Sequence, residues 1–321
     1  MKLSSGRVFR LSPRKPGNLL AALVPCLAFF LFPAAGQQPA RTPTKVLKVR
    51  GGAIDVSLPD EPMKASAQDL LHWIQNAVDA VTNYYGRFPV PHLTLLVGSG
   101  NGSGVRHGVT YGTDGGLIRI TVGRETLVDE LNDDWVLTHE MTHLAFPSMP
   151  DEQHWIEEGL ATYIEPVARA KVGQMPVGEM WRQFIRDMPK GEPRDGDQGL
   201  DHTPTWGRTY WGGAMFALVA DVDIRERTKN RLGLQDALRA IMNHATIADD
   251  WEIKKALAVG DRATGTNVLQ DLYQKMANQP APVDLAQMWD KLGMGLKDGK
   301  VVFNDKASDA AIRIAITAPH R

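Results

Sequence analysis

Residues 137–163 read LTHEMTHLAFPSMPDEQHWIEEGLATY, and this stretch contains the strongest indications of fold and chemistry in the chain. His139 and His143 are four residues apart within a helical pattern, so their imidazoles lie on one face of a helix and can reach the same metal ion. Glu140 projects beside the pair, where its carboxylate can hold a metal-bound water and take its proton. The alternative for these five residues is a histidine pair that is solvated, or satisfied inside the core.

A second helix supplies a candidate third ligand. Its apolar residues recur at intervals of four, three and four, which predicts a buried stripe of Ile156, Leu160, Tyr163 and Val167. Glu158 falls on the opposite face, where its carboxylate would complete the three protein ligands of a catalytic metal site. The alternative is a plain solvent-facing acid, because the same helix also carries Glu157 and Glu165.

The two helices are expected to pack against each other as antiparallel neighbours. A turn containing two prolines, 147–150, reverses the chain between them. Gly159 and Ala161 are small, so the second helix should pass close to the first and bring the carboxylate of Glu158 to the metal.

HEMTH followed by WIEEGLATY resembles the gluzincin metallopeptidases, and most of all the catalytic domain of the aminopeptidase N family. That family has its third zinc ligand in a W-x-x-E-G-x-A segment. The resemblance implies one zinc ion held by His139, His143 and Glu158, with Glu140 as the general base. It also implies a zincin-like, thermolysin-like catalytic domain that hydrolyses peptide bonds. The spacer between His143 and Glu158 is shorter here than in typical aminopeptidases, so the connecting turn must be tighter.

Two further segments match the same family. Residues 84–89 (YYGRFP) are similar to its Y-x-G-x-x-P segment, and residues 210–214 (YWGGA) resemble its Y-x-x-G-A segment. On that match Tyr210 would donate a hydrogen bond to the oxyanion. The alternative for Tyr210 is an aromatic residue at a helix start that packs on the core.

The chain departs from the aminopeptidase pattern in one segment. Aminopeptidases of that family bind the free amino terminus with a carboxylate in a G-x-M-E-N segment, whereas the corresponding stretch here, 108–123, has no glutamate and only Asp114 as an acid. Exopeptidase specificity therefore loses its physical basis, and an endopeptidase or a narrow-specificity peptidase is the better hypothesis. The expected strand 117–122 alternates as an edge or half-buried strand would, and it could hold an extended peptide by strand addition. The rival hypothesis is a catalytically inactive binding protein with the gluzincin fold.

The remaining pattern predicts an α+β protein, with a small mixed sheet over about 45–124 packed on a larger helical part over about 125–321. Paired glycines separate two short strands, and Gly86 should end a helix that begins near Ser66. Strands are expected at 46–49, 54–58, 92–97, 117–122, 300–303 and 311–316. Helices are expected at 66–85, 135–146, 152–171, 181–188, 210–225, 234–244, 267–277 and 285–292. The long polar loop 191–204 is expected to border the site.

Other polar and aromatic residues have expected positions on the surface, in the core or near the site. His154 and His202 are expected on the surface, because they have no second ligand spacing. Thr162 could hydrogen-bond a metal ligand, or equally its own helix backbone. Four of the eight tryptophans are expected in the helical core or the cleft wall: Trp181, Trp206, Trp211 and Trp289.

Composition and charge indicate the partners and the cellular location expected for this chain. The chain has 321 residues and a net charge of −1; five of its 36 basic residues and none of its 37 acids lie in 1–36, which leaves −6 for the rest. That balance argues against a nucleic-acid partner.

A basic start, an apolar run and small residues near Gly36 predict a signal peptide at 1–36, followed by a flexible segment at 37–44. We therefore expect export to the periplasm or medium, without stable membrane insertion. The oligomeric state does not follow from the sequence.

Overall fold

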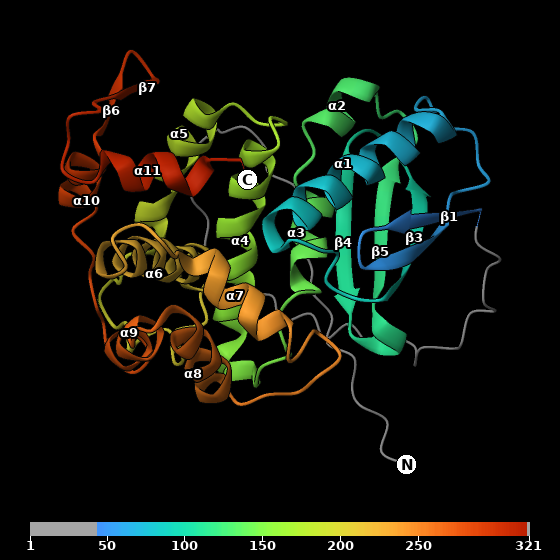
Figure 1. Cartoon of the computed structure of the whole chain (residues 1–321). Coiled ribbons are helices and arrows are strands. Elements are labelled where there is room, and N and C mark those ends of the chain that lie inside the picture. Colours follow the sequence, from blue (N-terminus) through green and yellow to red (C-terminus); the bar gives the residue numbers. More distant parts are fainter. Residues whose placement is uncertain (1–43, 320–321) are drawn as a thin grey trace.

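A computed structural model describes residues 44–319 of the protein, and its first part is a five-stranded mixed sheet (Figure 1). The strands are β1 (Lys45–Val49), β2 (Gly52–Ser57), β3 (His92–Gly100), β4 (Val105–Tyr111) and β5 (Leu117–Gly123). Their order across the sheet is β1-β2-β3-β5-β4, with β2, β3 and β5 parallel and the two outer strands antiparallel to their neighbours. The predicted signal peptide and nearly all of the segment that follows it lie outside the described residues.

The helix α1 (Ala67–Tyr85) covers this sheet and begins and ends where the sequence predicts. The side chain of Ser66 accepts a hydrogen bond from the Asp69 N–H and Asp69 reciprocates, which satisfies orphan donors of the first turn. Gly86 has φ 83°, a left-handed conformation that glycine adopts without steric cost, and it closes the helix. α1 packs on α3 (Val136–His143) and α4 (His154–Lys171), so it joins the sheet to the helices.

The sequence left two positions open for 117–122, and the structure shows the half-buried strand β5 rather than the edge of the sheet. β5 is hydrogen-bonded on both sides, to β3 and to β4, and β4 is the edge strand. The sequence of β4 contains Gly108 and lacks clean apolar alternation, and its register shifts between Val105 and His107, so it resembled part of a loop. β4 lies against α3.

The second part of the chain is mainly helical, and the combination confirms the predicted α+β class. It contains α2 (Val128–Asn132), α3, α4, α5 (Val177–Asp187), α6 (Gly213–Arg227), α7 (Leu234–Met242), α8 (Ile253–Thr264), α9 (Val268–Met276), α10 (Leu285–Leu292) and α11 (Ala310–Thr317). Short turns of 3-10 helix are η1 (Thr113–Gly115), η2 (Asp151–Gln153) and η3 (Met188–Gly191), and η4 (Gly207–Gly212) is a π-helical turn that continues into α6. The hairpin β6 (Met294–Lys297) and β7 (Lys300–Phe303) completes the fold. Neither α8 nor β6 was predicted.

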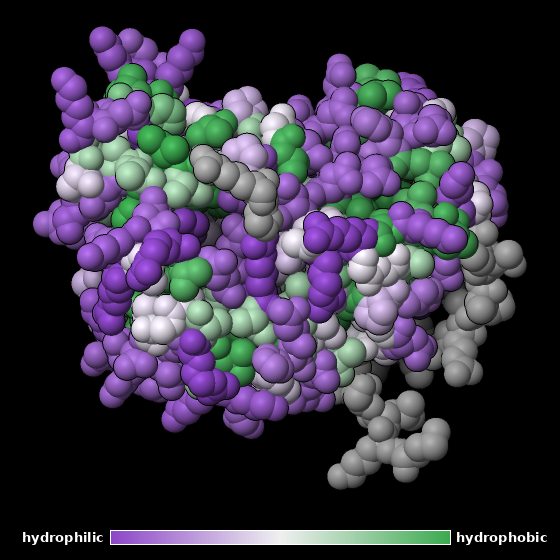
Figure 2. Space-filling model, viewed as in Figure 1, coloured by the Kyte–Doolittle hydropathy of each residue, from purple (hydrophilic) through white to green (hydrophobic). Residues whose placement is uncertain are grey.

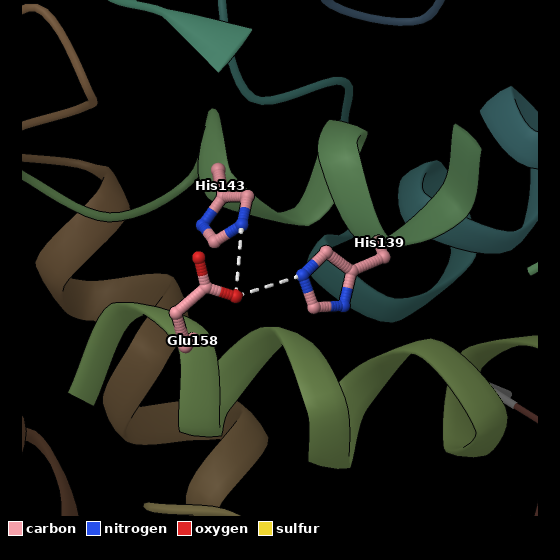
Figure 3. A group of neighbouring side chains, drawn as sticks. All are labelled: His139, His143 and Glu158. Carbon is pink, nitrogen blue, oxygen red and sulfur yellow. Dashed lines mark hydrogen bonds and ion pairs between the residues drawn. The ribbon is translucent and has the colours of Figure 1, made fainter. Parts of the chain in front are cut away.

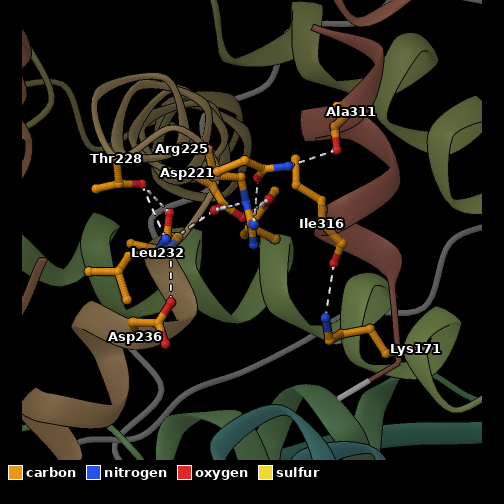
Figure 4. A network of polar contacts seen from close by, with 12 residues as sticks. Lys171, Asp221, Arg225, Thr228, Leu232, Asp236, Ala311 and Ile316 are labelled. Carbon is orange, nitrogen blue, oxygen red and sulfur yellow. Dashed lines mark hydrogen bonds and ion pairs between the residues drawn. The ribbon is translucent and has the colours of Figure 1, made fainter. Parts of the chain in front are cut away.

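The prediction of a strand at 311–316 was also wrong, because this segment is the helix α11. Its alternating isoleucines imitate a strand, but Ile312 and Ile316 are four residues apart and both are buried, as on one face of a helix. Polar contacts fix the helix in place: Asn230 donates to the carbonyl of Ala311, and the Lys171 amine donates to that of Ile316 (Figure 4).

The contact that brings α4 close to a neighbour is not the predicted one. Gly159 faces α6 rather than α3: a Cβ atom built on Gly159 would lie 2.2 Å from the Cα of Gly213. Two glycines therefore let the backbones of α4 and α6 touch. α4 is buried on nearly its whole circumference, including the stripe that the sequence predicts.

The surface is largely hydrophilic in the view of Figure 2. Apolar side chains gather at its upper left, where β6, β7 and α11 expose Leu296, Val302, Phe303 and Ile314. Over residues 44–319, none of the helices has the length and apolar character needed to cross a bilayer.

Candidate metal centre

Three of the predicted site residues converge between α3 and α4 (Figure 3). Nε2 of His139 lies 3.1 Å from Oε2 of Glu158, and Nε2 of His143 lies 3.9 Å from the same oxygen. One donor atom from each residue can be chosen so that all lie within 4.8 Å of one another, and all three side chains are buried. The solvent-facing alternative for Glu158 is therefore excluded.

The start of α3 is fixed by a half-buried acid, Asp134. Asp134 accepts hydrogen bonds from the N–H groups of Val136 and Leu137, at 3.0 and 3.1 Å, and from the indole of Trp73 at 2.9 Å. This capping satisfies backbone donors that a helix start leaves free. It ties the helix that carries both histidines to α1.

Burial and mutual contact set the charges of the three residues. Burial alone would raise the pKa of Glu158, but the hydrogen bond with His139 and the electrostatic interaction with the neighbouring imidazoles lower it below its ordinary value. Burial opposes protonation of His139, yet the Glu158 carboxylate outweighs it and raises the pKa of His139. Burial lowers the pKa of His143 to about 3. A carboxylate and a neutral imidazole are the forms in which these side chains bind metal.

Glu140 is fully buried beside this group, on the side covered by β4. Its Oε2 accepts a hydrogen bond of 2.5 Å from the Thr110 hydroxyl, and its Oε1 has no hydrogen-bond partner among residues 44–319. Burial raises the pKa of Glu140 to about 7. A carboxylate with one unpartnered oxygen and a pKa near neutrality suits a general base.

His154 was predicted on the surface, and its side chain is indeed 37% exposed, but it also contacts the metal centre. Its Nε2 lies 3.5 Å from Oε1 of Glu158, and its Nδ1 lies 3.5 Å from Oε2 of Glu157. The signal that could have revealed this is the spacing of four residues between His154 and Glu158 on one helix. His202, in contrast, is exposed and contacts Asn278.

Tyr210 comes from the π-helical turn η4. Burial raises the pKa of its hydroxyl, and the carboxylates of Glu158 and Glu140 raise it further, so the phenol stays neutral and can donate a hydrogen bond. The contact of Gly159 with Gly213 holds this helical segment against α4, three residues after Tyr210. π-helical turns occur frequently at functional sites.

A cavity of about 520 Å³ opens beside His139, and Figure 2 shows a notch in the surface between the parts that carry α2 and α5. Its walls include Trp135, Trp206, Tyr210 and Trp211. Thr162 also lines it. Trp181 and Trp211 are buried, as expected, and Trp206 is 55% exposed at the wall.

The loop 191–204 does not line this cavity. Asp201 accepts hydrogen bonds from Trp155 and Tyr273, which fasten the loop to the start of α4 and to α9. A buried ion pair of Asp197 with Arg208, 2.8 Å apart, joins it to η4. The loop therefore supports the segment that carries Tyr210, rather than bordering the cavity as expected.

The donor set fits a single zinc ion. Zinc takes imidazole nitrogen and carboxylate oxygen at about 2.0 Å, which puts tetrahedral donors about 3.3 Å apart, close to the separations found here. Within residues 44–319, no fourth histidine, cysteine or acid, His154 included, has a donor atom within 4.8 Å of those of all three residues. Three ligands leave a position open, as in catalytic rather than structural zinc sites.

Comparison with known proteins gives a fold likeness. The structure resembles that of an aminopeptidase N family protein from Idiomarina loihiensis, with a TM-score of 0.59 and 14% identity over 78% of this chain and 49% of that one. An M1 zinc metallopeptidase from Deinococcus radiodurans aligns with a TM-score of 0.45 and 14% identity, over 74% of this chain and 54% of that one. The chain thus spans about half the length of these structures. No family profile and no curated protein matches the sequence. The likeness confirms the resemblance in fold.

Proposed function

We propose that the protein is a zinc-dependent metallopeptidase in which His139, His143 and Glu158 hold one zinc ion. The observation that carries the proposal is the convergence of these three buried donors beside Glu140, whose Oε1 has no hydrogen-bond partner in the part of the chain that the structure describes. When bound, zinc would activate a water for attack and polarise the scissile carbonyl.

The remaining chemistry belongs to the side chains. Glu140 would accept the proton of the attacking water and transfer it to the leaving amine, a task suited to a carboxyl whose pKa burial raises to about 7. Tyr210 would donate its hydroxyl proton in a hydrogen bond to the developing oxyanion, because its raised pKa keeps it neutral.

The substrate is proposed to be a peptide or protein that binds along β4. β4 is the edge strand next to α3, so its outer side can add an extended peptide as a further strand. β4 therefore takes the place of the strand 117–122 as the peptide-binding strand, because both edges of that strand are hydrogen-bonded to neighbouring strands. The walls of the adjoining cavity combine four large aromatic rings with polar and charged side chains, and we propose that the rings bind a bulky apolar side chain of the substrate.

Endopeptidase or narrow-specificity activity is proposed over general aminopeptidase activity. Asp114, the one acid in the stretch 108–123, is exposed in the turn η1 beyond the end of β4. In the cavity, Glu165 is paired with Arg169 at 2.8 Å, Glu179 is paired with Arg182, and Asp133 is exposed to solvent. These carboxylates are therefore paired or solvated, and none is well suited to bind a free amino terminus.

Export to the periplasm or medium is also proposed, on the composition of residues 1–36 alone. The amino terminus of the protein recovered from an expressing culture tests it. A start near Gln37 in the exported fraction supports the proposal, and an intact start at Met1 in the cytoplasm contradicts it.

The test of the activity is cleavage of a mixed peptide library by wild type and Glu140→Gln, with zinc measured in both. The proposal expects cleavage by wild type, loss of cleavage in the variant, and one zinc per chain in each. A Glu140→Gln variant with full activity would refute the mechanism. Stoichiometric zinc without any cleavage by wild type would favour the inactive binding protein, although all four required side chains are present.

A further inference from the structure

β4 contacts the general base with two residues of one face. Gly108 and Thr110 are two positions apart on a strand, so both face α3, with Ile120 and Ile118 opposite them on β5. The Thr110 side chain is completely buried. Neither residue has a part in the chemistry proposed above.

Thr110 makes two contacts with the same glutamate. Its hydroxyl lies 2.5 Å from Oε2 and 3.0 Å from the backbone carbonyl oxygen of Glu140. The hydroxyl has a single proton, which the closer oxygen, Oε2, accepts, and this hydrogen bond restricts rotation of the Glu140 side chain. Hydrogen bonds to an ionised acceptor are short and strong, and burial removes water as a competitor.

Gly108 provides the space in which the carboxylate lies. A Cβ atom at this position would lie 2.5 Å from Cγ and 2.7 Å from Oε1 of Glu140. Gly108 does not have a positive φ, so its backbone would accept alanine without strain. The three atoms nearest to such a Cβ all belong to Glu140.

We propose that Thr110 is a positioning residue for Glu140: its hydroxyl holds Oε2 in place, Oε1 remains as the proton acceptor, and Gly108 keeps the space beside Oε1 clear. The inference rests on the proposed function, since it assigns the orientation of the general base to the edge strand. In this arrangement the outer edge of β4 binds the peptide, and its inner face orients the general base.

The experiment compares Thr110→Val, which has the same shape without the hydroxyl, with Thr110→Ser, which keeps the hydroxyl. We expect Thr110→Val to lower kcat about 10- to 100-fold with little change in KM, and Thr110→Ser to remain close to wild type. Both variants should contain one zinc per chain, because Thr110 is not a proposed zinc ligand. In a Glu140→Gln background, Thr110→Val should have no further effect on the residual rate.

Gly108→Ala gives an independent arm, with Gly98→Ala in β3 as the control. A Cβ at Gly98 meets only the carbonyl of Ile120 at 3.8 Å, an ordinary contact. We expect Gly108→Ala to lose activity and keep zinc, and Gly98→Ala to keep both. Thermal melting of each variant shows whether the fold is retained.

The inference is overturned if folded Thr110→Val turns over like wild type, or if Thr110→Ser loses as much activity as Thr110→Val. Wild-type activity in Gly108→Ala would also overturn it. Failure of the proposed function would look different, because wild type itself would then be inactive or Glu140→Gln would be fully active.

Discussion

The substitution Gly159→Ala tests how the fold places Tyr210 beside the metal centre. The new methyl carbon would lie 2.2 Å from the Cα of Gly213, which is about 1.3 Å less than the ~3.5 Å at which carbon atoms attract one another. It would also lie 2.3 Å from the Gly213 carbonyl carbon. These are main-chain atoms, so no side chain can turn away, and α4 and α6 must separate.

The cost follows from that displacement. Overpacking of a core costs about 1–3 kcal/mol, and the upper part of this range applies because backbone must move. A displacement of about 1 Å in a catalytic group can reduce the rate about 100-fold. We therefore expect about 3 kcal/mol less stability and about 100-fold lower kcat, with zinc retained through His139, His143 and Glu158.

Denaturant unfolding and peptide cleavage measure these two quantities. Gly178→Ala in α5 is the matched control, because a Cβ there would have no atom within 4 Å. That variant should be slightly more stable than wild type, since alanine is favoured over glycine in a helix by up to about 1 kcal/mol. If Gly159→Ala unfolds at the same denaturant concentration as wild type and keeps its kcat, the packing argument is wrong.

Three further predictions concern separate parts of the molecule. Tyr210→Phe should slow kcat by about 100- to 1,000-fold and leave zinc content unchanged, and an unaltered kcat would remove Tyr210 from the mechanism. Trp206→Ala should raise KM for peptides with a bulky apolar side chain more than for peptides with a small one; equal changes for both would contradict a role in specificity. Burial lowers the pKa of Lys171 to about 8 from 10.5, so the unfolded chain binds more protons between these values and folding stability rises with pH there. The stability of wild type relative to Lys171→Met, from denaturant melts at pH 7.5 to 10, should therefore increase with pH, and a flat or falling difference would refute this.

The metal centre was predictable because its information is local. His139 and His143 are one helical turn apart, and the apolar stripe of the next helix fixes which way Glu158 faces. Both facts follow from one continuous stretch of sequence, 139–167. Ser66 and Gly86 likewise carry local capping signals, and α1 begins and ends beside them.

What could not be predicted depends on partners that are distant in sequence. β4 exists because β5 pairs with it, and its single glycine and its polar residues give no strand pattern of their own. Thr110 and Glu140 are 30 residues apart, so their contact has no sequence signature. Gly159 shows the same limit: its small size predicts a close approach but not whether α3 or α6 is the neighbour.

The contact of His154 with Glu158 is an intermediate case. The spacing of four residues on one helix allows it, but the same spacing occurs along any helix. Only the position of Glu158 between α3 and α4 shows that the neighbouring imidazole is next to a metal-binding carboxylate.

Zinc binding by the purified chain tests the central claim most directly. Titration into metal-free protein should give one tight site in wild type and in Glu152→Gln, an exposed acid near the start of α4. Glu158→Gln and His143→Ala should each bind at least about 100-fold more weakly, because each removes one of three ligands. Zinc bound by Glu158→Gln as tightly as by wild type would contradict the account.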